Sequence, residues 1–192
     1  MASDVFSAKR ALRAEIRQRR RIATATERTQ DAEGHTARLI ELAERLGATS
    51  VATYLSMGHE PDTRGFLAWA QEHGIKALLP ISRDDGLLDW APYDAGVEDR
   101  DIHGMLIPTS ELLGPIAIND VDLILAPASA IDLTGMRMGW GRGYFDRTLG
   151  SMASRPPVYA VIFDHELLDE VPHDEHDERL DGVVTPTRIL TF

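Results

Sequence analysis

The sequence predicts an α/β protein: one three-layer α/β/α domain around a mostly parallel, Rossmann-like sheet. Short apolar runs, typical of buried strands, alternate along the chain with segments that have the apolar periodicity of amphipathic helices. No internal repeat, low-complexity tract or long linker interrupts the 192 residues. A chain of this length can bury a substantial core without disulfides or metals, so we expect a single domain spanning residues 1–192.

The composition is that of an acidic globular protein, with 43% hydrophobic residues, 27% charged residues and a net charge of −11. This charge argues against general nucleic-acid binding, and no apolar run approaches the roughly 20 residues that span a bilayer. The chain has no cysteine, which excludes disulfides and suits a reducing compartment. We therefore expect a cytoplasmic protein without nucleic-acid or membrane partners. A monomer is expected, with a homodimer as the alternative.

Two helices are predicted at the N-terminus, over residues 7–22 and 26–46. The first 21 residues hold seven lysines and arginines against two acidic residues, so a basic segment joins an acidic body. Lys9 and Arg13 are four apart and project from one side of the first helix. Taken alone, this pattern more often marks a solvated cationic face than a phosphate site. The second helix, with Thr26 as predicted N-cap and Gly47 past its end, is assigned no chemistry.

A strand over residues 51–55 leads into a polar loop over residues 56–63 and a helix over residues 64–72. Ligands of α/β sheets gather at the carboxyl ends of strands, so this loop is well placed for binding. Asp62 or Thr63 could cap the helix, whereas Glu60 lies too far upstream to do so. Four further strands are predicted, over residues 77–80, 87–91, 158–163 and 183–185, the last of them just before the tail.

The rest of the chain is organised around residues 121–149. Residues 121–126 form a predicted buried strand, which Pro127 ends because proline has no N–H to donate. A glycine-rich stretch carrying Arg137 and Arg142 follows, and a helix starts at Tyr144. Strand, glycine loop and helix start can together bind an anion, and Asp146 could hold a divalent cation against phosphate oxygens. The spacing matches neither the P-loop nor the dinucleotide motif, and a glycine-rich surface hairpin remains an equal alternative.

The segment over residues 172–178 is rich in histidine and acidic residues. Its composition resembles a transition-metal site, but such a run is more often a hydrated acidic loop. Two histidines only three positions apart also need further ligands at defined geometry.

Four stretches, in order along the chain, resemble one known family. They are SAKRALRAEI at residues 7–16, YLSMGHEPDT at 54–63, GMRMGWGRGYFDR at 135–147 and PHDEHDERLDGVVT at 172–185. The third is similar to the G-x-R-L-G-x-G-x-G-Y-Y-D signature of the 5-formyltetrahydrofolate cyclo-ligases, also called 5,10-methenyltetrahydrofolate synthetases. Four ordered matches are far more specific than one glycine loop.

The resemblance implies an enzyme that converts 5-formyltetrahydrofolate and ATP, with Mg²⁺, to 5,10-methenyltetrahydrofolate, ADP and phosphate. ATP phosphorylates the formyl oxygen, N10 attacks the formyl carbon, and phosphate leaves as the ring closes. Arg142 and Tyr144 would be the catalytic residues, and Asp146 and Asp177 would hold Mg²⁺. The expected ATP-binding residues are Lys9, Arg13, Arg137, Gly139, Trp140, Gly141, Arg142, Gly143, Tyr144 and Phe145. The expected folate-binding residues are Leu55, Glu60 and Tyr144.

The chain departs from the family pattern over residues 80–90 and at Met105, where a tryptophan is expected near the substrate. The folate-facing wall is therefore the part of the site that the resemblance specifies least. Two alternatives to the enzyme stay open: a non-catalytic nucleotide- or anion-binding module that keeps the glycine loop, and an interaction protein that uses the basic N-terminal helix.

Overall fold

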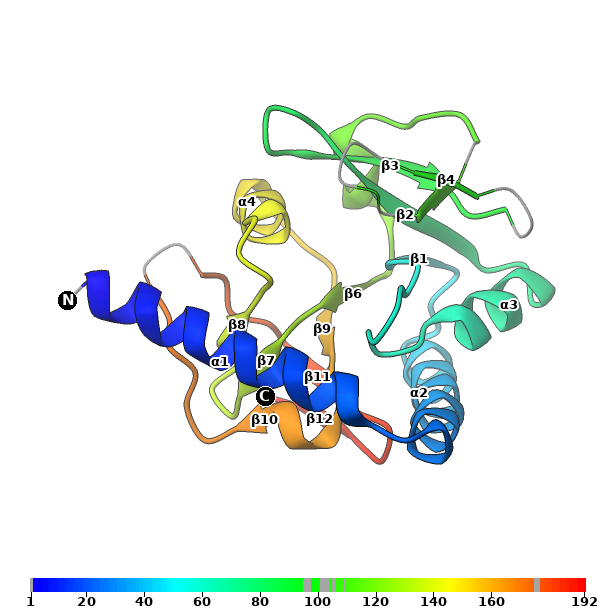
Figure 1. Cartoon of the computed structure of the whole chain (residues 1–192). Coiled ribbons are helices and arrows are strands. Elements are labelled where there is room, and N and C mark those ends of the chain that lie inside the picture. The colour runs from blue at the N-terminus through cyan, green and yellow to red at the C-terminus, as the bar shows by residue number, and fades with distance from the viewer. Residues whose placement is uncertain (1, 95–97, 101–103, 105, 109, 175–176) are drawn as a thin grey trace.

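The structure is a computed structural model that describes residues 2–94, 98–100, 104, 106–108, 110–174 and 177–192 (Figure 1). The helices are α1 (Ala2–Ile22), α2 (Ala25–Leu46), α3 (Arg64–Glu72) and α4 (Tyr144–Ser151), with 3₁₀ turns η1 (Pro115–Asp120) and η2 (Asp164–Glu166). The strands are β1 (Ser50–Ala52), β2 (Lys76–Ser82), β3 (Leu88–Pro92), β4 (Glu98–Arg100), β5 (Leu106–Pro108), β6 (Leu123–Pro127), β7 (Ala130–Asp132), β8 (Arg137–Met138), β9 (Val158–Val161), β10 (Leu167–Leu168), β11 (Gly182–Val184) and β12 (Ile189–Thr191).

The central sheet has seven strands in the order β12-β11-β9-β6-β1-β2-β3. The five inner strands pair in parallel, while β3 and β12 pair antiparallel at the two edges. Among the inner strands the chain runs outward from β1 to β2 on one side and from β6 through β9 to β11 on the other. The direction of winding therefore reverses between β1 and β6, and ligands of open parallel sheets bind outside the carboxyl ends of the strands at such a point.

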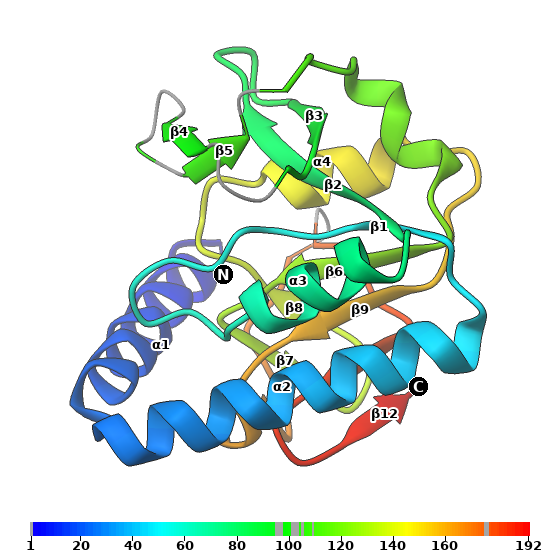
Figure 2. The same cartoon turned by 90° about the vertical axis from the view of Figure 1, so that its right-hand side faces the viewer.

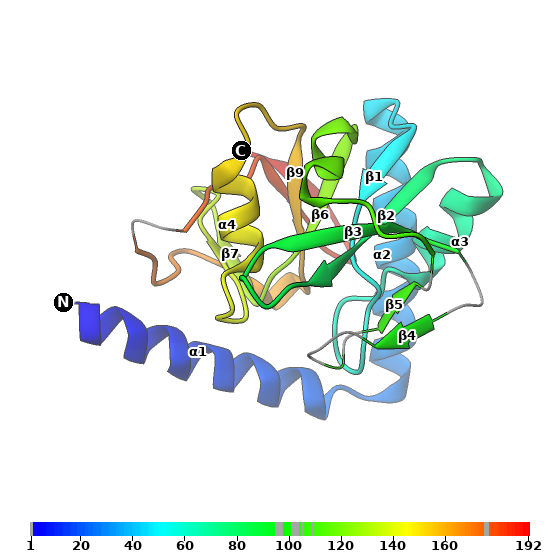
Figure 3. The same ribbon diagram turned by 90° about the horizontal axis from the view of Figure 1, so that it is seen from above.

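Helices cover both faces of this sheet, which confirms the predicted three-layer architecture. Figure 2 looks onto the face covered by α2 and α3, and Figure 3 shows α4 on the opposite side. One apolar cluster joins α2 and α3 to the sheet through residues such as Leu39 and Phe66, both fully buried. A second joins α4 and η1 to the other face, with Ile118 and Phe145 among its members.

Helix α1 stands apart from these layers and lies across the carboxyl ends of the parallel strands (Figure 3). It packs through a small apolar cluster that includes Ile16, Met136 and Met138, and this cluster reaches the small sheet of order β10-β7-β8. The remaining strands, β4 and β5, form a two-stranded antiparallel sheet. Within the described ranges, no helix combines the length and the apolar character needed to cross a membrane.

Several predicted boundaries shift. Helix α2 starts one residue earlier than predicted, and its N-cap is Thr24, not Thr26. Thr24 Oγ1 accepts from the backbone N–H of Glu27, and the Glu27 carboxylate accepts from the N–H of Thr24 in return. This reciprocal capping box satisfies two otherwise unpaired donors at the helix start.

Pro127 ends the β6 ladder as predicted, but the strand is Leu123–Pro127 and not residues 121–126. Pro127 is the last residue of β6 and pairs in register with Val161 of β9. Proline is compatible with a strand end, where its missing donor leaves no gap in the ladder. The tail after β11 was expected to follow the last strand, but it returns as β12, antiparallel to β11.

Candidate active site

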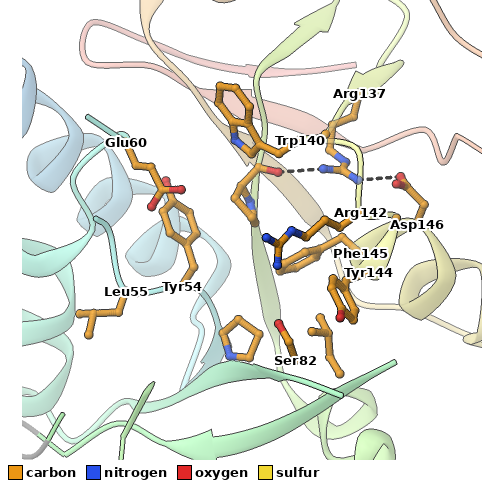
Figure 4. Close-up of a pocket in the computed structure, with 15 residues that line it drawn as sticks. Tyr54, Leu55, Glu60, Ser82, Arg137, Trp140, Arg142, Tyr144, Phe145 and Asp146 are labelled. Carbon is orange, nitrogen blue, oxygen red and sulfur yellow. Dashed lines mark hydrogen bonds and ion pairs between the residues drawn. The ribbon is translucent and has the colours of Figure 1, made fainter. Parts of the chain in front are cut away.

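A cavity of about 240 Å³ opens at the reversal point of the sheet. It lies beside the segment that follows β1, the end of β6, and the glycine-rich loop that leads into α4. Its lining residues are Tyr54, Leu55, Glu60, Pro80, Ser82, Leu88, Pro127, Arg137, Gly139, Trp140, Arg142, Gly143, Tyr144, Phe145 and Asp146. Ten of these are labelled in Figure 4, with Tyr54, Leu55 and Glu60 on one side and the glycine-rich loop on the other.

The backbone of the glycine-rich loop has conformations that favour glycine. Gly141 has φ +95° and Gly143 has φ +69°, and Gly143 is the N-cap of α4. A side chain at position 141 would also approach the Arg13 guanidinium, since an added Cβ would lie 3.2 Å from Nη1. The glycines thus allow both the turn into α4 and the close approach of an arginine from α1, as an anion-binding loop requires.

Arg137 and Asp146 form an ion pair inside this loop. Arg137 is 2% exposed; its Nη2 donates to Asp146 Oδ1 at 2.6 Å and its Nη1 donates to the Pro127 carbonyl at 2.8 Å. The pair therefore ties the end of β6 to the first turn of α4. Asp146, an expected metal ligand, has Oδ1 committed to this guanidinium, as Figure 4 shows.

Arg142 differs from Arg137 in being exposed and in pointing toward the cavity (Figure 4). Across the part of the chain that the structure describes, no hydrogen bond or ion pair engages its guanidinium. Its neighbour Tyr144 lines the same cavity, and the Tyr144 hydroxyl donates to the Arg83 carbonyl at 3.0 Å. The ring of Tyr144 is thereby held between α4 and the turn that joins β2 to β3.

Helix α1 contributes two cations near the loop, as the resemblance implies. Arg13 Nε donates to the Gly139 carbonyl at 2.8 Å. Lys9 is 6% exposed, and its Nζ contacts Asp174 at 2.7 Å and Asp177 at 2.5 Å. Burial alone would lower the pKa of Lys9, but the hydrogen bonds to the two carboxylates outweigh it and raise the pKa above its usual value. Lys9 is therefore not part of a solvated cationic face.

Glu60 lies across the cavity from Arg137 and Asp146 (Figure 4). Its carboxylate accepts from the Met57 backbone N–H at 2.9 Å, and burial raises its pKa above the ordinary value of 4.5. As expected, it does not cap α3: Asp62 accepts from the N–H of Arg64, while the Thr63 hydroxyl donates to the Tyr54 carbonyl. Glu60 is thus held by its own turn and faces the cavity.

The cavity also has walls that sequence reasoning did not identify. Tyr54 is one of them, and its buried hydroxyl donates to the Pro61 carbonyl at 3.0 Å, which closes the loop after β1. Pro80, Ser82 and Leu88 form another side, from the region where the chain departs from the family pattern. The signal for them was their place in the last residues of β2 and the first residue of β3, since β2 pairs with β1, the strand that leads into the loop of Glu60.

The two expected magnesium ligands both have cationic partners. Asp177 pairs with Lys9 and Asp146 with Arg137, and the charges of both carboxylates act on Arg13. No group of three or more potential ligating side chains occurs within the described ranges. Met105 lies outside the described residues, as do positions 175 and 176 of the acidic segment.

Comparisons with known proteins identify the family of the chain. The model of the 5-formyltetrahydrofolate cyclo-ligase family matches residues 5–186. The 5-formyltetrahydrofolate cyclo-ligase of Mycolicibacterium smegmatis is 36% identical over 149 residues, which cover 75% of this chain and 77% of the relative. The enzyme of the same name from Escherichia coli K12 is 28% identical over 183 residues, covering 91% and 98%.

Solved structures show the same fold. The NMR structure of Aquifex aeolicus 5,10-methenyltetrahydrofolate synthetase has a TM-score of 0.79 at 24% identity, covering 95% of this chain and 92% of that one. A 5,10-methenyltetrahydrofolate synthetase from Mycoplasma pneumoniae has a TM-score of 0.74 at 20% identity, covering 93% and 98%. The family model spans nearly the whole chain, and the chain therefore belongs to the 5-formyltetrahydrofolate cyclo-ligase family of enzymes.

Proposed function

We propose that the protein converts 5-formyltetrahydrofolate and ATP, with Mg²⁺, to 5,10-methenyltetrahydrofolate, ADP and phosphate. A formamide carbon is a poor electrophile and its oxygen a poor leaving group. Transfer of the γ-phosphoryl group to the formyl oxygen makes that oxygen a phosphate leaving group. N10 then attacks the formyl carbon, the new C–N bond closes the ring, and phosphate departs with the former formyl oxygen.

The observation that carries the proposal is the glycine-rich loop with cations on both sides of it. Among the described residues none bonds the Arg142 guanidinium, which points into the cavity, and Arg13 reaches the loop from α1. Phosphoryl transfer depends chiefly on positioning and on neutralising charge, which arginine forks and backbone N–H groups supply. In this proposal Arg13, Arg142 and Lys9 hold phosphate oxygens, with Arg137, Gly139, Trp140, Gly141, Gly143 and Phe145 forming the rest of the nucleotide site.

The donor set near the loop fits Mg²⁺. This ion is commonly held by one or two carboxylates together with substrate phosphates, so the two aspartates suffice without a larger cluster. Asp146 and Asp177 would hold it, in exchange for part of their contact with Arg137 and Lys9. When bound, Mg²⁺ would supply neutralisation of phosphate charge.

The folate would occupy the opposite side of the cavity. Glu60 is half-buried, faces the cavity and can accept two N–H donors of the pterin at once. Leu55 offers apolar contact from the segment after β1. Tyr144 would lie between nucleotide and folate, because it lines the cavity next to Arg142 while its hydroxyl is fixed by the Arg83 carbonyl.

The test is formation of the methenyl product, followed by absorbance, with 5-formyltetrahydrofolate, ATP and Mg²⁺ each omitted in turn. Product and ADP should form in equal amounts, and only when all three are present. A protein that binds ATP but forms no methenyl product would be the non-catalytic nucleotide module. Product that forms equally well without ATP or without Mg²⁺ would refute the corresponding part of the proposal.

A further inference from the structure

A buried ion pair lies next to the proposed site without lining its cavity. Arg20 is 5% exposed and Glu166 is fully buried. Arg20 Nε donates to Glu166 Oε1 at 2.6 Å and Nη2 donates to Oε2 at 2.8 Å, while Nη2 also donates to the Ala128 carbonyl at 3.0 Å. Such a forked contact with a carboxylate uses the planar geometry of guanidinium, which lysine cannot reproduce.

The same guanidinium contacts the wall of the cavity. Its central carbon lies 4.9 Å from the ring centroid of Trp140 and 5.2 Å from that of Phe163. Trp140 lines the cavity, and it also lines a neighbouring cleft together with Arg20. A second arginine of α1, Arg17, lies 5.1 Å from the Trp140 ring. Helix α1 therefore fixes an aromatic wall as well as supplying charge.

The pair also acts on the end of β6, at the reversal point of the sheet. The Ala128 carbonyl accepts from Arg20, and the preceding carbonyl, of Pro127, accepts from Arg137. Two buried arginines, paired respectively with Glu166 and Asp146, thus hold consecutive carbonyls where β6 meets the cavity. This arrangement sets the position of the backbone on which the cavity is built.

Stability alone is a weak reason for such a pair. Removing two charged groups from water costs free energy that their attraction often fails to recover, so apolar replacements are frequently neutral or stabilising. We propose that Arg20 and Glu166 are positioning residues, which hold Trp140 and the end of β6 in the geometry that substrate binding in the cavity requires. The proposal rests on the proposed function of the cavity, and both residues act through Trp140 and the backbone.

Two variants test this role, Glu166→Gln and Arg20→Lys. The first keeps the size of the side chain but removes its charge and turns an amide toward the guanidinium; the second keeps the charge but loses the fork. Misplacement of binding groups by about an ångström can cost up to a hundredfold in rate, so we expect kcat/KM for 5-formyltetrahydrofolate to fall about tenfold or more. The kcat/KM for ATP should fall as well, because Trp140 is part of the proposed nucleotide site.

A second readout follows Trp140 itself, without turnover. The chain has three tryptophans, and the emission of Trp140 is obtained by subtracting the spectrum of Trp140→Phe measured in each background. In both variants we expect this difference emission to move to longer wavelength, because the ring loses its fixed neighbours and gains contact with water. Circular dichroism and thermal melting establish that the measurements are made on folded protein.

The matched control is Glu41→Gln. Glu41 pairs with Arg38 at 2.5 Å on the surface of α2, where its side chain is 46% exposed. Glu41→Gln makes the same chemical change in an Arg–Glu pair that lines no described cavity. Its kinetics and its Trp140 emission should therefore match those of wild type.

Lower thermal stability with unchanged folate kinetics and Trp140 emission would reduce the pair to a structural role and overturn the proposal. If Glu166→Gln does not fold, Arg20→Lys is measured in its place. If wild type forms no methenyl product, the proposed function fails separately, while the emission shift still tests the positioning of Trp140.

Discussion

Lys9→Ala is the substitution whose consequences the structure defines best. Lys9 Nζ contacts Asp174 at 2.7 Å and Asp177 at 2.5 Å, and its side chain is 7% exposed. The variant removes this charge, leaving two carboxylates without their shared partner. We therefore expect two separate effects, one on the attachment of α1 and one on ATP.

The size of the stability effect follows from the exposure of the two partners. Asp177 is 13% exposed, so its hydrogen bond to Lys9 should contribute about 1.5–3 kcal/mol. Asp174 is 49% exposed, and its contact should contribute less than about 1 kcal/mol. The free energy of unfolding should therefore fall by about 2–4 kcal/mol. For a chain of this size the melting temperature should fall by about 5–15 °C.

The effect on ATP is separate. If Lys9 also reaches the phosphates, the loss of a charged hydrogen bond should raise the ATP KM about tenfold or more. Thermal melting gives the first quantity, and steady-state kinetics at a temperature where the variant is folded gives the second. Arg10→Ala is the control, because Arg10 is an exposed cation on the same helix that lines no described cavity.

The two effects of Lys9→Ala are independent of each other. An unchanged melting temperature would mean that the buried ion pair does not stabilise the fold. A lower melting temperature with an unchanged ATP KM would make Lys9 an anchor of α1 and remove it from the nucleotide site.

Three further changes probe the loop and the folate side. Asp146→Asn should lower kcat about a hundredfold across a Mg²⁺ titration while the fold persists, and near-normal turnover at low Mg²⁺ would exclude Asp146 as a ligand. Glu60→Gln should raise the folate KM and leave the ATP KM near wild type. Because burial raises the pKa of Glu60, its carboxylate takes up a proton at higher pH than an ordinary glutamate, so the wild-type folate KM should rise as the pH falls through that pKa. A folate KM equally pH-dependent in the variant would contradict this. Gly143→Ala should cost about 1–2 kcal/mol of stability at φ +69°, measured by chemical denaturation, whereas Gly114→Ala, at φ −65° with open space around it, should be neutral.

The sequence by itself determined the architecture and the chemical character of the site. Alternation of apolar runs with helical periodicity depends on local spacing, and it predicted α3 over residues 64–72 and the three-layer α/β order along the chain. The glycines also predicted a tightly turning loop, because φ values such as that of Gly141 favour glycine. Boundaries that depend on pairing, such as Pro127 within β6, were predicted less well, since a strand end depends on its neighbour.

Only the tertiary structure decided which groups meet. Lys9 and Asp177 are 168 positions apart, and no spacing rule indicates that one neutralises the other. The same holds for Arg20 and Glu166, which are 146 positions apart. Because both side chains are buried, each charge needs the other as its partner. Local sequence sets the propensity of a segment and the chemistry of its side chains. Contacts between distant segments depend on how helices and strands pack, and that packing placed α1 across the carboxyl ends of the strands, where its cations reach the glycine-rich loop.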